Sequence, residues 1–127
     1  MKSKPVTDAD IADRVRRAVA AADDRKAIDL KVLDLAKVTD FTDYFLIMSG
    51  ASDRQVQAIA DAVDETLRAD KVRPLHTEGL RGGHWVLLDY GDFIVHVFDE
   101  ETRRFYSLER LWADAPEVTE RFRAAAS

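Results

Sequence analysis

The segment 44–56 reads Tyr44-Phe45-Leu46-Ile47-Met48-Ser49-Gly50-Ala51-Ser52-Asp53-Arg54-Gln55-Val56. Its first five residues are apolar on both alternating faces, which is typical of an interior strand that is covered on both sides. Gly50 and Ala51 end this strand, and Ser52 with Gln55 has the spacing of a capping box at the start of a helix. The segment therefore predicts an interior β-strand that runs directly into a helix.

Two amphipathic helices are predicted on either side of this strand in the sequence. The helix after Ser52 has an apolar stripe at helical spacing, made of Val56, Ile59, Val63 and Leu67. Residues 8–26 follow the candidate caps Thr7 and Asp8 and carry a second stripe, made of Ile11, Val15, Ala18, Val19 and Ala22. Each helix is expected to bury one face.

Four further strands complete the predicted sheet. Residues 28–35 are β-branched only in part and ambiguous in period, but their short length favours a strand over a helix. Residues 72–76 contain Pro74, which is tolerated best at a sheet edge. Residues 85–90 and 93–98 flank Gly91-Asp92, a pair suited to a two-residue hairpin. This hairpin pairs Tyr90 with Phe93, Leu88 with Val95 and Val86 with Val97 on an apolar face, and Asp89 with Ile94, Leu87 with His96 and Trp85 with Phe98 on a mixed face.

The rest of the chain is expected to be less regular. Gly79, Gly82 and Gly83 predict a mobile loop, and residues 103–112 read as a strand end that turns at Ser107 into a short helix stopped by Pro116. Residues 1–6 and 117–127 are expected to be flexible tails of a single domain, 1–127. The predicted fold class is α/β (α+β): a mixed sheet of about five strands with two main helices and a short C-terminal helix.

The composition excludes several classes of function. The 127 residues include no cysteine, so disulfides, zinc–thiolate sites, iron–sulfur clusters and cysteine nucleophiles are excluded. Lys and Arg total 19 against 24 Asp and Glu, and this net charge of −5 disfavours indiscriminate binding to phosphate backbones. The sequence shows no signal peptide and no apolar run of about 18 residues. We therefore expect a cytoplasmic protein without a membrane anchor.

The sequence contains only weak signals for a catalytic or metal site. His76, His84 and His96 have no metal-binding spacing, even with Asp89 or Asp99 as a further ligand, so no metal is predicted. The turn 49–52 resembles the start of a nucleotidyltransferase site. However, Asp89 and Asp92 are separated by three residues and cannot share one strand face as paired metal ligands. No catalytic residue and no cofactor is therefore predicted.

The pattern of charge indicates a protein partner instead. Residues 82–102 contain no Lys or Arg but five acids, namely Asp89, Asp92, Asp99, Glu100 and Glu101. Such a segment repels phosphate and suits a basic protein. Trp85, Arg104, Tyr106 and Trp112 supply the residue types that most often anchor interfaces. Two alternatives remain open: a nucleotidyltransferase-like enzyme with an unrecognised active site, and an RNA-binding assembly factor that uses Arg14, Arg16 and Arg17.

An ordered series of motifs resembles the ribosomal silencing factor S family, also called the Iojap family. The series is Thr42-Asp43-Tyr44-Phe45, Ser49-Gly50-Ala51-Ser52, Arg54-Gln55-Val56, Glu78-Gly79, Trp85-Val86-Leu87-Leu88-Asp89-Tyr90-Gly91-Asp92, Val95-His96-Val97-Phe98, Arg104-Phe105-Tyr106 and Leu108-Glu109-Arg110-Leu111-Trp112. The likeness covers residues 28–118. One departure is Lys71, which stands where many members have a helix-ending glycine.

This resemblance implies a nucleotidyltransferase-like fold without catalytic acids and without a cofactor. It also implies a translational repressor that binds the universal large-subunit ribosomal protein fourteen at an intersubunit bridge and prevents the small subunit from joining. A homodimer that dissociates when one copy binds a ribosome is a further implication, and sequence-specific binding of nucleic acid is not expected. The partner-binding residues carried over on the matched motifs are Trp85, Asp89, His96, Phe98, Tyr106, Leu108, Glu109 and Trp112.

Overall fold

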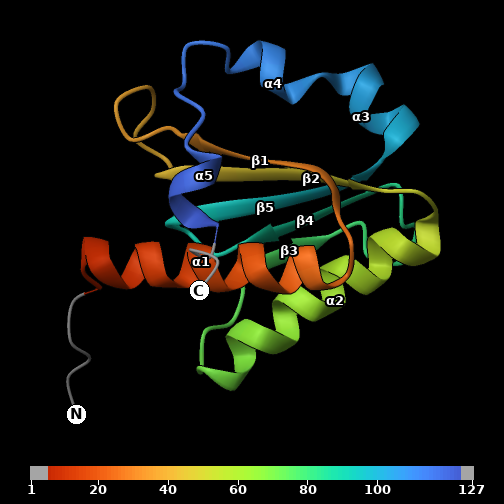
Figure 1. Ribbon diagram of the computed structural model, residues 1–127, viewed down its shortest axis with the longest axis horizontal. Coiled ribbons are helices and arrows are strands. Elements are labelled where there is room, and N and C mark those ends of the chain that lie inside the picture. Colours follow the sequence, from red (N-terminus) through yellow and green to blue (C-terminus); the bar gives the residue numbers. More distant parts are fainter. Residues whose placement is uncertain (1–5, 124–127) are drawn as a thin grey trace.

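A computed structural model describes residues 6–123 as one mixed sheet with helices on both faces (Figure 1). The strand order is β1-β2-β5-β4-β3, in which β2 and β5 are parallel and the other neighbours are antiparallel. The strands are β1 Ile28–Asp34, β2 Tyr44–Gly50, β3 His76–Glu78, β4 Trp85–Asp89 and β5 Phe93–Asp99. The predicted α+β class with a mixed five-stranded sheet is confirmed, and the arrangement is consistent with a nucleotidyltransferase-like label.

The helices divide between the two faces of the sheet (Figure 1). One face carries α1 Asp8–Asp24 and α2 Asp53–Ala69; the other carries α3 Glu100–Tyr106 and α4 Leu108–Leu111, and α5 Thr119–Phe122 packs beside β1. The predicted stripes of α1 and α2 are buried against the sheet, together with Leu88, Val95 and Val97 from the hairpin. This layer holds the larger of two hydrophobic clusters.

The β2–α2 unit forms as the sequence predicts. Ser52 Oγ accepts a hydrogen bond from the Gln55 backbone N–H at 3.1 Å and caps the helix. In a standard capping box the Gln55 side chain would accept from the N–H of the N-cap residue, Ser52. Here Gln55 Oε1 instead accepts from the N–H of the preceding residue, Ala51, at 2.7 Å. Its amide nitrogen also donates to the carbonyls of Arg25 and Lys26, which ties the α1–β1 turn to α2.

The β4–β5 hairpin has the predicted register. Leu88 faces Val95 and Val86 faces Val97, while Trp85 faces Phe98 across the strands. Gly91 has φ +86, as the first central residue of a tight two-residue turn requires. All three apolar pairs predicted for one face therefore lie in the core between the sheet and the two long helices.

The edge strand differs from the prediction in position. Residues 72–75 are not a strand, and β3 instead spans His76–Glu78. Pro74 has no N–H to donate, so the first bond to β4 comes from the Leu75 N–H to the Asp89 carbonyl at 2.7 Å. The glycine loop that follows, predicted to be mobile, is bound to α2, since the Gln57 amide donates to the carbonyls of Leu80 and Arg81.

The segment after β5 is helical, so the predicted strand end at residues 103–106 was wrong. Asp99 caps α3, with its Oδ1 accepting from the Thr102 N–H at 2.7 Å. Ser107 has φ 47, and this left-handed residue separates α3 from α4. The helix after Ser107 is present but ends at Leu111, before Pro116, whose carbonyl accepts from the Asp34 N–H.

Residues 117–123 are part of the fold, and the prediction of a flexible tail there was wrong. The Val118 N–H donates to the Val32 carbonyl at 2.8 Å, and the Val32 N–H donates to Thr119 Oγ1 at 2.9 Å. Phe122 is 1% exposed and packs edge-on against Tyr44, with ring centroids 5.1 Å apart. Residues 1–5 and 124–127 of the predicted tails lie outside the described residues.

Candidate partner-binding face

The face of the sheet opposite α1 and α2 is only partly covered. Here α3 packs on β2 and β5, whereas Trp85, Leu87 and Asp89 on β4 remain partly exposed. Aromatic and apolar side chains from three separate segments surround this open strip. We define the docking face as Phe41, Trp85, Leu87, Phe105, Tyr106 and Trp112.

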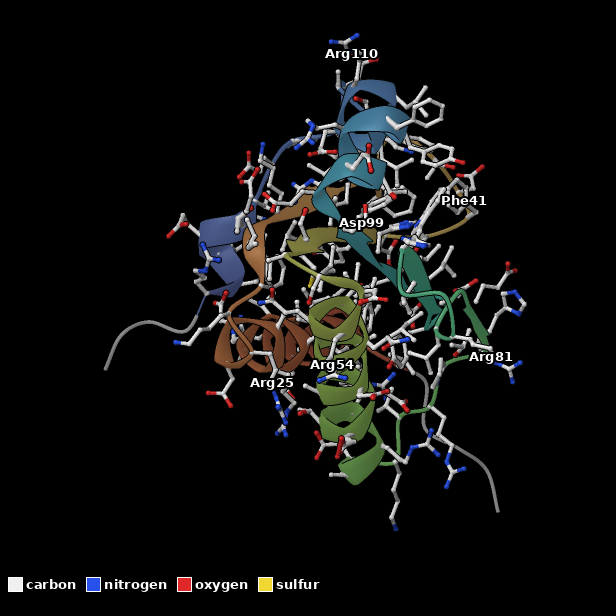
Figure 2. The ribbon with its side chains drawn as sticks, turned by 90° about the vertical axis from the view of Figure 1, so that its right-hand side faces the viewer. Arg25, Phe41, Arg54, Arg81, Asp99 and Arg110 are labelled. Carbon is white, nitrogen blue, oxygen red and sulfur yellow. The ribbon has the colours of Figure 1, made fainter. Side chains whose placement is uncertain are left out.

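Ring contacts connect most of this face into one network. Trp85 packs between Phe98 and Tyr106, with ring centroids 4.8 Å from each. At the other end, Phe41 and Trp112 meet edge-on at 5.8 Å, and Figure 2 shows Phe41 projecting from the β1–β2 loop. Tilted and edge-on rings at these distances stabilise one another beyond their buried area, so the face is a preformed surface.

His96 lies beside Trp85 on the neighbouring strand β5 and fixes its orientation. The Trp85 Nε1–H donates to His96 Nδ1 at 3.1 Å, so the ring of His96 is neutral and carries its proton on Nε2. Burial lowers the pKa of His96 to about 4. A neutral acceptor at this point keeps the indole in place near neutral pH.

The partner-binding residues predicted from the sequence fall into two groups. His96, Phe98 and Leu108 are buried, so they support the docking face from below and offer little surface to a partner. Trp85, Asp89, Glu109 and Trp112 are partly exposed, and Tyr106 is 48% exposed. The structure thus brings the aromatic residues of the predicted set together. It also distinguishes the buried residues that support the docking face from the residues that lie at its surface.

Three exposed apolar residues were missed by the sequence reasoning. Phe105 is 79% exposed, Leu111 is 72% exposed and Phe41 is 56% exposed. Phe105 and Leu111 lay within the matched motifs. Because residues 103–106 were predicted as a strand end, the sequence did not indicate that these two side chains point to solvent. Phe41 precedes the first matched motif and follows a run of polar loop residues, so no local signal marked it.

The acids of residues 82–102 do not all face solvent freely. Asp89 Oδ1 accepts from the Gly91 N–H at 2.8 Å and stabilises the hairpin turn. Burial opposes ionisation of Asp99, but hydrogen bonds from Thr102 and His84 outweigh it and lower its pKa. The remaining acids, Asp92, Glu100 and Glu101, make no ion pair within residues 6–123.

The histidines and the 49–52 turn are engaged in structural contacts. His84 Nδ1 lies 2.7 Å from Asp99 Oδ2, His76 bonds Glu78, and His96 bonds Trp85. Within the described part of the chain, no three His, Asp or Glu side chains gather as metal ligands. At Gly50, a Cβ atom would lie 2.9 Å from the Val56 nitrogen, so close packing of strand and helix requires glycine here.

A comparison with known protein families gives a match over residues 8–127 to the family described as "Ribosomal silencing factor during starvation". The chain belongs to this family. The ribosomal silencing factor RsfS of Bacillus subtilis is 44% identical over 99 residues, which cover 78% of this chain and 84% of that protein. The chloroplastic protein Iojap of Zea mays is 30% identical over 98 residues, which cover 77% of this chain and 42% of that protein.

Solved structures agree with this family membership. A crystal structure of a Chromobacterium violaceum protein superposes with a TM-score of 0.79 at 36% identity and covers 81% of this silencing-factor chain and 86% of its own. The predicted family is therefore confirmed, and its description gives ribosomal silencing during starvation as the role for which the family is named. Between residues 6 and 123, no helix is long and apolar enough to span a bilayer.

Proposed function

We propose that the protein binds the large ribosomal subunit through the universal ribosomal protein fourteen, covers an intersubunit bridge and prevents the small subunit from joining. Translation would then be repressed without any chemical step, so the protein is not expected to be an enzyme and needs no cofactor. Off the ribosome, we expect a homodimer that dissociates on binding, in the cytoplasm.

The observation that carries this proposal is the docking face. Its six aromatic or apolar residues come from three segments: three are exposed and three are partly exposed, and they gather around the strip of β4 that α3 and α4 leave uncovered. Continuous apolar surface on a small soluble domain marks an interaction site, whereas single exposed apolar residues do not. Trp and Tyr are also the commonest energetic anchors of interfaces.

Charge supports a basic partner for this face. Glu100 and Glu101 lie in the first turn of α3, next to Phe105 and Tyr106 along the same helix. Ribosomal proteins carry basic surfaces that hold RNA, so these carboxylates would accelerate the encounter. The aromatic contacts would then set the lifetime of the complex.

The alternative of an RNA-binding assembly factor is less well supported. Arg17 is paired with Asp13 at 2.9 Å and with Asp70 at 2.6 Å, and the guanidinium carbon of Arg16 lies 5.9 Å from the centroid of the Phe122 ring. Two of the three arginines proposed to bind RNA therefore already have partners within the fold.

The test is sedimentation of the protein with purified large subunits. Phe105→Asp places a charge in the docking face, and Leu80→Asp places the same charge on the loop beside α2. Both side chains are exposed, so both variants should fold. We expect Phe105→Asp to weaken binding about tenfold or more and Leu80→Asp to bind like the parent. Equal binding by both variants, or no sedimentation of the parent, would contradict the proposal.

A further inference from the structure

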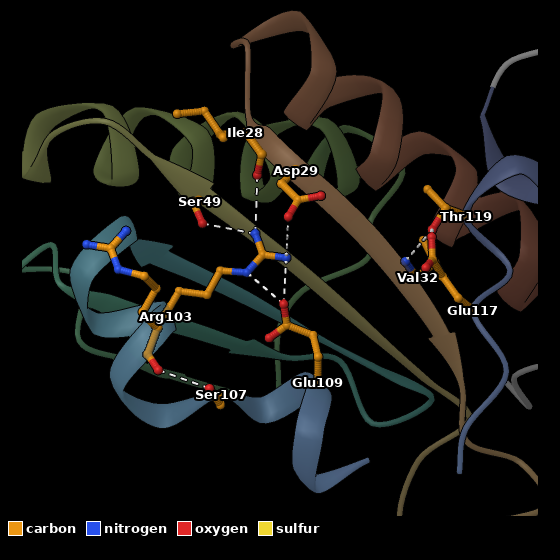
Figure 3. A network of polar contacts seen from close by, with 10 residues as sticks. Ile28, Asp29, Val32, Ser49, Arg103, Ser107, Glu109, Glu117 and Thr119 are labelled. Carbon is orange, nitrogen blue, oxygen red and sulfur yellow. Dashed lines mark hydrogen bonds and ion pairs between the residues drawn. The ribbon is translucent and has the colours of Figure 1, made fainter. Parts of the chain in front are cut away.

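Arg103 is a buried cation in a helix that is otherwise exposed. It is 7% exposed, and its Nη1 donates to Ser49 Oγ at 2.9 Å and to the Ile28 carbonyl at 3.3 Å (Figure 3). Its Nε donates to Glu109 Oε2 at 3.0 Å, and Asp29 Oδ2 lies 3.6 Å from Nη2. One side chain thus links α3 to α4 and to the adjoining ends of β1 and β2.

Few side chains of α3 and α4 are buried against the sheet. Arg103 and Leu108 are the two buried residues of these helices. Between the helices and the strand ends lies a polar cavity of about 340 Å³, lined in part by Asp29, Ser49, Arg104 and Arg110. Leu108 packs in the smaller apolar cluster and Tyr106 packs on Trp85, while the polar contacts of Arg103 attach α3 and α4 at the cavity. By contrast, full apolar stripes hold α1 and α2.

The strands are shaped to receive the guanidinium. Asp29 has φ 48, a left-handed conformation that is unfavourable for a residue other than glycine, and the β1–β2 register is irregular between Ile28 and Lys31. Backbone strain of this kind persists where surrounding contacts require it. Here the distorted strand end presents both the Ile28 carbonyl and the Asp29 carboxylate to Arg103.

We infer that Arg103 is a positioning residue that fixes α3 and α4 and so sets the geometry of the docking face. This inference rests on the proposed function. Phe105 and Tyr106 lie within one helical turn after Arg103, and Tyr106 packs on Trp85, so any rotation of α3 displaces two of the six residues of the face. The planar fork of arginine suits this role, because several donors reach a carboxylate, a hydroxyl and a carbonyl together.

Hydrogen exchange tests the attachment without any partner. Arg103→Met removes the charge but keeps an unbranched side chain, and Arg104→Met makes the same change at the exposed neighbour. We expect Arg103→Met to increase exchange of the amides in residues 100–111 about tenfold or more while β2 and β5 keep their protection. Unchanged exchange in this segment, or equal loss of protection in the sheet, would overturn the inference.

Sedimentation with large subunits then tests the consequence. Arg103→Met should weaken binding about tenfold or more, and Arg103→Lys should recover part of it. Arg25→Met, at an exposed arginine in the turn between α1 and β1, should bind like the parent. Normal binding by Arg103→Met would overturn the inference even if exchange increases. If the parent itself does not bind, the proposed function is wrong. The exchange result still shows whether Arg103 holds α3 and α4 against the sheet.

A milder variant covers the case in which Arg103→Met does not fold. Glu109→Gln keeps a hydrogen-bond acceptor but removes the charge that pairs with Arg103 at 2.9 Å. We expect faster exchange in residues 100–111 and weaker binding, both smaller than for Arg103→Met. If exchange in Glu109→Gln matches that of the parent, the ion pair does not hold the helices and the inference is wrong.

Discussion

Acid should destabilise this protein through His96. Burial lowers the pKa of this side chain from 6.5 in the unfolded chain to about 4 in the folded state. Between these two values the unfolded chain binds a proton that the folded protein does not. The free energy of unfolding must therefore fall as the pH decreases through this window.

The size of the effect follows from the shift. Each pKa unit corresponds to about 1.36 kcal/mol, so linkage gives a loss of about 1.4 kcal/mol by about pH 5.5 and about 2.5 kcal/mol by about pH 4.5. The physical cause is that protonation would force a charge into the aromatic cluster and remove the acceptor that Trp85 uses.

Urea denaturation of the parent and of His96→Asn at several pH values isolates this contribution. The Asn side-chain oxygen can accept from Trp85 Nε1–H as Nδ1 does, but it does not titrate. Carboxylates titrate equally in both proteins, so the difference between their unfolding free energies should change by about 2.5 kcal/mol between pH 7 and about pH 4.5. A difference that is constant to within about 0.5 kcal/mol would refute the assignment of His96 as a buried neutral acceptor.

Three substitutions test other parts of the fold by urea denaturation. Leu88→Ala should lower the free energy of unfolding by about 2–5 kcal/mol, because Leu88 lies on the buried face of the hairpin; a loss under about 0.5 kcal/mol would place the register one residue off. Phe122→Ala should cost about 3–5 kcal/mol, whereas a flexible tail would show almost none. Lys71→Gly should raise stability by about 1 kcal/mol, because Lys71 follows the C-cap of α2 with φ 64; no gain would mean that this backbone is unstrained.

The parts of the fold that were predicted depend on neighbouring residues in the sequence. The Ser52 cap, the stripes of α1 and α2 and the Gly91 turn each rest on contacts a few residues apart. The hairpin turn then sets the pairing of β4 with β5, so the two faces of the hairpin followed from turn length alone. Local geometry was sufficient for this half of the structure.

The parts that were missed depend on distant contacts. In α3 the buried residue is an arginine whose partners come from β1, β2 and α4, so no apolar periodicity marks the helix. Likewise, Phe122 and Thr119 are buried because β1 lies beside them, and Thr119 bonds Val32, 87 positions away. The sequence motifs identified the residues of the candidate site. Which of those residues are exposed, however, is decided by these contacts between distant segments.

Subunit joining tests the central claim most directly. Purified large subunits are incubated with the protein, small subunits are added, and the fraction of joined ribosomes is measured by sedimentation, with Leu80→Asp and Phe105→Asp as matched variants. We predict that the parent and Leu80→Asp prevent joining in proportion to the amount bound, and that Phe105→Asp does not. Complete joining in the presence of bound parent protein would contradict the account.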